Sequence, residues 1–268
     1  MNPSPAVPVA RALAGASLVV TRPAADATAF VRRARSLGAR ALRLPGTALR
    51  ARGALAMPDP PCEAWIFTSP AAVRHAFTSA RLVPDARVAA FAVGEGTRRA
   101  LARHGIAAAA PQRADSEGLL ALPGLASVRG QRIALVGAPG GRGLIDAQLR
   151  RRGAEVVALH VYERVPPRWS TRQLEALRSA PAPLLTLVSS GEALANLAGR
   201  LPADVFERLR IGWLVTSSDR LAGLARGAGF EAIEVAASAS AGDLFAAAQR
   251  AWNRARAPAA AAGDTPFR

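Results

Sequence analysis

The chain has 268 residues, a formal net charge of +16 and a hydrophobic share of 50%. This length suits one or two domains, and the hydrophobic share excludes a wholly disordered protein. The single cysteine, Cys62, excludes an internal disulfide and a cysteine metal cluster, and no apolar run approaches the roughly 18 residues of a membrane span.

All of the basic side chains are arginine. One interpretation of this arginine excess is a composition bias of the whole genome. The other is a functional one, in which the positive field attracts anions. The arginines are spread over many predicted helices, and the clusters at 32–35 and 150–152 end helices, where cations complement the helix dipole. No zinc-finger spacing or RNA-binding signature occurs. We therefore expect a small polyanionic ligand and no nucleic acid.

The two ends of the chain are rich in proline, alanine and polar breakers. We predict disordered tails at 1–15 and 255–268. The first residues contain two early prolines and no cationic segment, so we expect no secretory signal and a cytoplasmic protein.

Short apolar runs alternate with helical patterns in the first half of the chain. The predicted strands are 18–21, 41–44, 65–68 and 88–93, and the predicted helices start at Asp26, Pro70, Thr97 and Ser116. The stretch 46–61, with three prolines, is expected to be irregular and to serve as a linker.

The second half repeats this alternation. Strands are predicted at 132–136, 155–161, 184–188, 211–215 and 231–235, and helices at 143–152, 191–200, 219–228 and 242–253. The stretch 162–169, with Pro166 and Pro167, is a second linker candidate. Strands and helices alternating in this way predict an α/β fold with parallel sheets covered on both faces.

The pattern is also duplicated. The unit at 18–40 resembles the unit at 133–155, and the unit at 66–98 resembles the unit at 187–220, at nearly constant spacing. We therefore expect two β/α domains of similar design.

Candidate site residues lie on the turns that follow the predicted strands, where ligands of parallel sheets bind. These turns carry hydroxyls, glycines and helix N-termini, which suit anions: Thr21-Arg22, Thr68-Ser69, 94–97, 137–143, Ser189-Ser190 and 216–218. For any single turn, helix capping is the better explanation. For six turns together, a shared ligand surface is favoured.

Groups for acid–base or metal chemistry are scarce. His75, His104 and His160 fall on predicted helices or a strand, and none has the spacing of a metal pair. The glycine-rich loop 137–143 lacks both the dinucleotide fingerprint and the Walker lysine, so it is a weak nucleotide site. We expect no metal and no cofactor, and a protein that orients a reactive ligand.

Several short motifs occur together in a specific order. They are Thr21-Arg22-Pro23, Phe67-Thr68-Ser69, Val93-Gly94-x-x-Thr97, Ser116-x-Gly118-Leu119, Val161-Tyr162 and Ser240-x-Gly242-x-Leu244. With this order and spacing, residues 16–250 resemble the uroporphyrinogen-III synthase family.

The resemblance implies a fold of two Rossmann-like or flavodoxin-like parallel-sheet domains, joined by a two-strand linker with a cleft between them. Domain 1 would comprise 16–44 and 170–254, domain 2 would comprise 61–158, and the linkers would be 45–60 and 159–169. A monomer is expected.

The implied reaction dehydrates and cyclises the linear tetrapyrrole hydroxymethylbilane, and inverts ring D through a spiro intermediate, in haem biosynthesis. Tyr162 would assist departure of the hydroxyl group, the alternative being a tyrosine that anchors the linker. Arg22, Ser69 and Thr97 match family positions expected to contact the substrate. The other expected substrate-binding residues are Gly94, Ser116, Ser190 and Ser218.

Asp219 departs from the family pattern and places a negative charge beside the turn of Ser218. No membrane contact is expected, and a transient contact with the upstream bilane-forming enzyme is the expected protein partnership. Two other classes stay open at this point: a non-catalytic anion-binding or regulatory module, and a nucleotide-using transferase.

Overall fold

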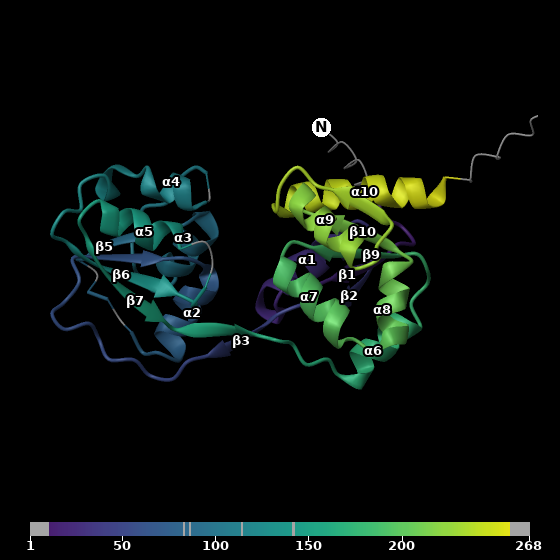
Figure 1. Ribbon diagram of the computed structural model, residues 1–268, viewed down its shortest axis with the longest axis horizontal. Helices are drawn as coiled ribbons and strands as arrows, with labels where there is room; N and C mark the ends of the chain where they lie inside the picture. The colour runs from purple at the N-terminus through teal and green to yellow at the C-terminus, as the bar shows by residue number, and fades with distance from the viewer. Residues whose placement is uncertain (1–10, 83, 86, 114, 141–142, 258–268) are drawn as a thin grey trace, which may run out of the picture. The chain divides into compact units, whose positions relative to one another are not determined.

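The structure is a computed structural model that describes residues 11–82, 84–85, 87–113, 115–140 and 143–257 (Figure 1). The chain divides into two units. Unit 1 comprises Met1–Ala48 and Val165–Arg268, and unit 2 comprises Leu49–Arg164. Unit 1 is thus built from both ends of the chain.

Unit 1 contains a parallel five-stranded sheet in the order β11-β10-β9-β1-β2. Its strands are β1 (Ser17–Val20), β2 (Arg40–Arg43), β9 (Leu184–Val188), β10 (Trp213–Thr216) and β11 (Ala232–Val235). Counted along the chain within this unit, the order is 2-1-3-4-5, which is the flavodoxin-like order. The strand order therefore reverses between β1 and β9.

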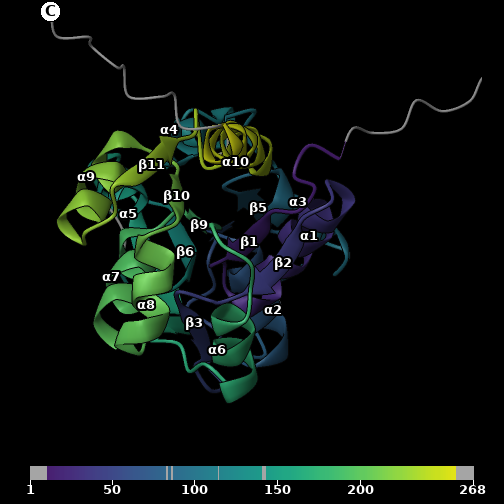
Figure 2. The ribbon, with the colours of Figure 1, turned by 90° about the vertical axis from the view of Figure 1, so that its right-hand side faces the viewer.

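Helices cover both faces of this sheet (Figure 2). Along β1, Leu18 and Val20 pack on the side of α1 (Ala24–Ser36) and α10 (Ala241–Arg256), whereas Val19 packs on the opposite side. That opposite side is covered by α6 (Thr171–Arg178), α7 (Gly191–Arg200), α8 (Ala203–Arg210) and α9 (Asp219–Gly227). Alternate side chains of a strand point to opposite faces, so β1 is buried on both.

Unit 2 repeats this design with a four-stranded parallel sheet in the order β5-β4-β6-β7. The strands are β4 (Ala64–Phe67), β5 (Ala89–Ala92), β6 (Arg132–Gly137) and β7 (Glu155–His160). One face packs on α2 (Pro70–Thr78) and α3 (Glu95–Ala102). The other packs on α4 (Ser116–Leu120), α5 (Leu144–Arg151) and the 3-10 turn Pro123–Leu125.

The chain passes between the units through β3 (Ala48–Ala51) and β8 (Tyr162–Val165), which pair as a two-stranded sheet. An ion pair of 2.7 Å joins Arg50 to Glu163 across these strands. Residues 48–51, expected from composition to be irregular, are therefore a strand. No helix among the described residues is both long and apolar enough to span a membrane.

The prediction of disordered tails is wrong for 11–15 and for 255–256. Leu13 is fully buried in the core of unit 1, and its backbone N–H donates to the Leu37 carbonyl at 2.9 Å. At the other end, α10 continues to Arg256. The remaining parts of the predicted tails, 1–10 and 258–268, lie outside the described residues, and residue 257 follows the last helix.

Candidate functional site

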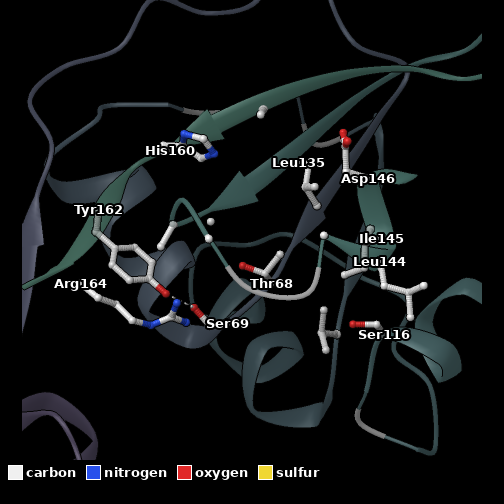
Figure 3. Close-up of a pocket in the computed structure, with 16 residues that line it drawn as sticks. Thr68, Ser69, Ser116, Leu135, Leu144, Ile145, Asp146, His160, Tyr162 and Arg164 are labelled. Atoms are coloured by element: carbon white, nitrogen blue, oxygen red, sulfur yellow. Dashed lines mark hydrogen bonds between the residues drawn. The ribbon is translucent and has the colours of Figure 1, made fainter. Parts of the chain in front are cut away.

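Unit 2 holds a cavity of about 280 Å³ at the carboxyl edge of its sheet (Figure 3). Thr68 and Ser69 line it from the turn after β4, Gly137 from the end of β6, and His160 from the end of β7. β4 and β6 are the neighbours between which the strand order reverses, and ligands of such sheets bind at that point.

The cavity has an apolar side and a polar side. Leu135 and Ala158 line it from the exposed part of the sheet, and Leu144 and Ile145 line it from the first turn of α5. The hydroxyl, imidazole and guanidinium groups come from the turn after β4, from the first residue of α4, and from the end of β7 and the following β8. This combination suits a flat apolar ring that carries acid groups.

Tyr162 contributes a hydroxyl to the polar side. Its side chain is only 3% exposed, and its hydroxyl oxygen lies 3.2 Å from Ser69 Oγ. Ser69 also caps α2, because its Oγ accepts the Ala72 backbone N–H at 3.0 Å. The two hydroxyls carry two hydrogens, and their mutual bond uses one. One O–H is therefore left to donate to a ligand.

His160, Tyr162 and Arg164 alternate along the chain from the end of β7 into β8, and all three line the cavity. Arg164 follows Tyr162 by two residues in β8, so both side chains leave the strand on the same side, and Figure 3 draws Arg164 at the Tyr162 end of the cavity. The intervening Glu163 pairs with Arg50. Arg164 is exposed, and it forms no ion pair within the part of the chain that the structure describes.

Asp146 brings a negative charge to the same cavity. Its carboxylate is held by Arg150, one helical turn away, at 3.0 Å. In Figure 3 it lies across the cavity from Tyr162 and Arg164. Asp146 is paired with Arg150, whereas Arg164 has no ion pair among the described residues, so an anionic group in the cavity is attracted toward Arg164.

Gly137 is required by close packing against Thr68. The Thr68 hydroxyl donates to the Val136 carbonyl at 3.1 Å. A Cβ atom built on Gly137 would lie 2.5 Å from Thr68 Oγ1, closer than such atoms can approach. Glycine at the end of β6 thus allows the turn after β4 to form one wall of the cavity.

His75, on α2, lies against Tyr162 outside the cavity lining. The centres of the two rings are 5.4 Å apart. His75 Nδ1 is buried and has no hydrogen-bond partner among the described residues. Burial, with a smaller contribution from the positive charge of Arg74, lowers the pKa of His75. This favours the neutral imidazole.

The predicted site residues fall into two groups. Ser69, Ser116 and Tyr162 line the cavity. Gly94 caps α3 beside it, while Thr97, one turn later, is 3% exposed and is not part of the lining. His160 and Arg164 were not among the predicted site residues, although their alternation with Tyr162 is visible in the sequence.

The other predicted residues lie in unit 1, on the turns after β1, β9 and β10. The Arg22 guanidinium donates to the Ala239 carbonyl at 2.9 Å and stacks on Phe30 at 4.7 Å. Burial lowers its pKa, against the opposing charge of Asp26.

Ser190 and Ser218 cap α7 and α9 with bonds of 3.4 Å. Each oxygen accepts a backbone N–H, and the hydroxyl hydrogen is still available to a ligand. Contact with a substrate therefore stays a prediction for these residues. The neighbouring Asp219 is exposed in the first turn of α9, where its charge complements the helix dipole.

Comparison with known proteins gives one consistent result. Residues 28–246 match the family described as uroporphyrinogen-III synthase HemD. The uroporphyrinogen-III synthase of Escherichia coli K12 is 37% identical over 165 residues, which span 59% of this chain and 66% of that protein. The enzyme of the same name from Salmonella typhimurium LT2 is 38% identical over 186 residues, 65% of this chain and 74% of that protein.

Solved structures show the same fold. Uroporphyrinogen-III synthetase from Helicobacter pylori 26695 superposes with a TM-score of 0.65 at 15% identity, over 88% of this chain and 99% of that one. A mutant uroporphyrinogen III synthase from Thermus thermophilus gives a TM-score of 0.51 at 19% identity, over 89% and 99% of the two chains. These likenesses agree with the α/β class predicted from the sequence.

Proposed function

The chain belongs to the uroporphyrinogen-III synthase family, a family of lyases of porphyrin and haem biosynthesis, and from this membership we propose that it converts hydroxymethylbilane to uroporphyrinogen III. The observation that carries the proposal for this chain's own residues is the cavity at the strand-order reversal of unit 2, with Tyr162 and Ser69 hydrogen-bonded in its wall.

The reaction needs little acid–base machinery. The hydroxyl of the hydroxymethyl group takes up a proton and leaves as water, which turns the first pyrrole ring into an azafulvene cation. The closed product later releases a proton as its rings become aromatic again, so the proton balance is zero. Ring D attacks this cation through its substituted carbon and gives a spiro intermediate, which fragments and recloses with ring D inverted. Closure without an enzyme gives isomer I, so the main task of the protein is to hold the two ends of the chain in one arrangement.

Tyr162 is the proposed donor to the departing hydroxyl. A phenol is a weak acid, so its contribution is a hydrogen bond that strengthens as the C–O bond breaks. The Ser69–Tyr162 pair retains one O–H for this purpose, and burial of the phenol ring holds its direction. Backbone N–H groups at the helix N-termini would bind acid side chains of the substrate.

The direct test is to supply freshly made hydroxymethylbilane, oxidise the product and separate the isomers. We expect isomer III from the wild type. Isomer I alone, at the uncatalysed rate, would overturn the proposal.

Replacing Tyr162 by Phe removes one hydroxyl and keeps the ring. Loss of a single neutral hydrogen bond should slow isomer III formation about tenfold without abolishing it. The measurement is turnover at saturating substrate, with circular dichroism as the folding control. An unchanged turnover would leave Tyr162 as a structural residue.

We extend the proposal to the other predicted site residues. Arg22, Gly94, Thr97, Ser116, Ser190 and Ser218 would contribute contacts to the acid side chains of the bilane. The enzyme would act as a cytoplasmic monomer, and a dimer seen by light scattering during turnover would contradict this. A transient contact with the enzyme that forms the bilane is part of the same proposal. Chemical cross-linking of the two enzymes during coupled turnover, with an inert protein as the control, tests that contact.

A further inference from the structure

The size of the cavity limits what can enter it. Pockets that enclose drug-sized ligands measure roughly 300–1,000 Å³, and the cavity in unit 2 measures about 280 Å³. A linear tetrapyrrole has four rings, each with two acid side chains, and is too large for this space. One pyrrole ring with its side chains is of suitable size.

The charges around the cavity determine how a bound pyrrole ring would be oriented. Arg164 is the cation at the Tyr162 end of the cavity, and it has no ion pair within the described residues, because the neighbouring Glu163 is bound to Arg50. Asp146 lies across the cavity. The acid end of a ring would therefore lie toward Arg164.

The apolar lining supports the same direction. Leu135 and Ile145, which Figure 3 shows away from Arg164, offer an apolar surface to the flat face of a ring.

We infer that the cavity holds the terminal pyrrole ring that carries the hydroxymethyl group, and that Arg164 binds a carboxylate of this ring. Arg164 is then a positioning residue: by holding the acid side chain it places the hydroxymethyl group at the Tyr162 hydroxyl. This inference rests on the proposed function for the identity of the ring.

The contact has a specific chemistry. A guanidinium can bind both oxygens of a carboxylate through two parallel N–H groups, whereas an ammonium acts as a point charge. Replacing Arg164 by Lys should therefore retain attraction but lose orientation, and replacing it by Gln should lose both.

The first experiment separates binding from turnover. For Arg164→Gln we expect the KM for hydroxymethylbilane to rise about tenfold or more, because a charge-assisted bond to the substrate is lost. Arg164→Lys should give a smaller rise in KM and an increased share of isomer I. Arg103→Gln, which removes an exposed charge from the same unit outside the cavity lining, is the matched control and should leave KM unchanged.

The second experiment does not depend on turnover. Tyr162 is the single tyrosine of the chain, so tyrosine labelled with ¹³C in the ring gives one NMR signal from the cavity wall. The probe is a monopyrrole with one acetate and one propionate side chain, added to the full chain. Its dimethyl ester is the uncharged control ligand.

We expect the diacid to shift the tyrosine signal saturably, and Arg164→Gln to weaken this binding about tenfold while leaving the weak binding of the diester unchanged. A diacid that binds wild type and variant equally, or that leaves the tyrosine signal in place, would overturn the inference. Failure of the proposed function is distinct: the wild type would then form no isomer III, whatever the monopyrrole result.

Discussion

Burial favours the neutral form of His75, and this makes the free energy of unfolding depend on pH. The pKa of this imidazole is lowered in the folded protein. As the pH falls below the ordinary histidine value of 6.5, the unfolded chain therefore binds a proton before the folded chain does. Stability that is intact above this pH is then lost as the pH falls toward the folded-state pKa.

Replacing His75 by Gln removes this titration. We expect the loss of unfolding free energy between pH 7.5 and pH 5.5 to be smaller in His75→Gln than in the wild type, as measured by denaturant titration at both pH values. Other groups contribute to both proteins and cancel in the comparison. Equal losses in the two proteins would show that His75 does not titrate in this range.

The sequence did not identify two residues of the cavity lining, His160 and Arg164, as site residues. His160 is the last residue of a strand, and a search confined to the turns after strands passes over it. Arg164 lies in a proline-rich stretch that is typical of a linker. Their relation to Tyr162 depends on the continuation of the chain from β7 into β8, which brings alternate residues to one side.

At the scale of elements, the end of β6 packs against the turn after β4 through the contact between Gly137 and Thr68. Replacing Gly137 by Ala should displace the Thr68 side chain, destabilise the protein by about 1–3 kcal/mol and lower turnover. The second variant, Thr68→Ala, removes the obstructing hydroxyl. Because the next Thr68 atoms lie 3.5 Å away, the double variant should recover part of the lost stability.

This pair of substitutions forms a double-mutant cycle, read by thermal unfolding of the four proteins. Additive losses of stability would contradict the close contact. The isomer assay on the same four proteins then shows whether the wall of the cavity is restored along with the packing.

Helix caps of unit 1 provide a test of the predicted substrate contacts. Asp is as good an N-cap as Ser, so Ser190→Asp and Ser218→Asp should keep the melting temperature. A new carboxylate beside an acid side chain of the substrate should nevertheless raise KM several-fold. Ser170, which caps α6 and is outside the predicted site, is the matched position for the same substitution. An unchanged KM in both variants would remove these turns from the site.

The elements themselves were largely predictable because short buried strands and amphipathic helices leave local patterns. The predictions for β9 and α7 coincide with the structure at every residue. α6 and α8 were missed, although α6 begins with a capping box at Ser170 and Gln173. The order of strands was not derivable from these patterns, since β1 pairs with β9 across the whole of unit 2.

At the scale of the molecule, the hydrophobic cores are separate. Among the residues that the structure describes, two core clusters lie in unit 1 and two in unit 2, and each cluster takes its residues from one unit. We therefore expect unfolding in two transitions. Trp65, buried in β4, is the tryptophan of unit 2, and the other three belong to unit 1.

Trp65→Phe makes the units distinguishable. In this variant tryptophan fluorescence reports unit 1 alone, whereas far-ultraviolet circular dichroism reports both units. Fluorescence should show one transition, that of unit 1, at its wild-type midpoint. Dichroism should show in addition the transition of unit 2, at a lower denaturant concentration than in the wild type. A single transition common to both probes would contradict independent units.

The position of β1 in its sheet also has a consequence for synthesis. This strand needs β2 on one side and β9 on the other, and the ribosome makes all of unit 2 before it reaches β9. At about 5–20 residues per second, the edge of β1 waits on the order of ten seconds for its second neighbour. Open strand edges are where foreign chains pair. The nascent chain therefore completes its inserted unit first, and its earliest strand is exposed to wrong partners for longest.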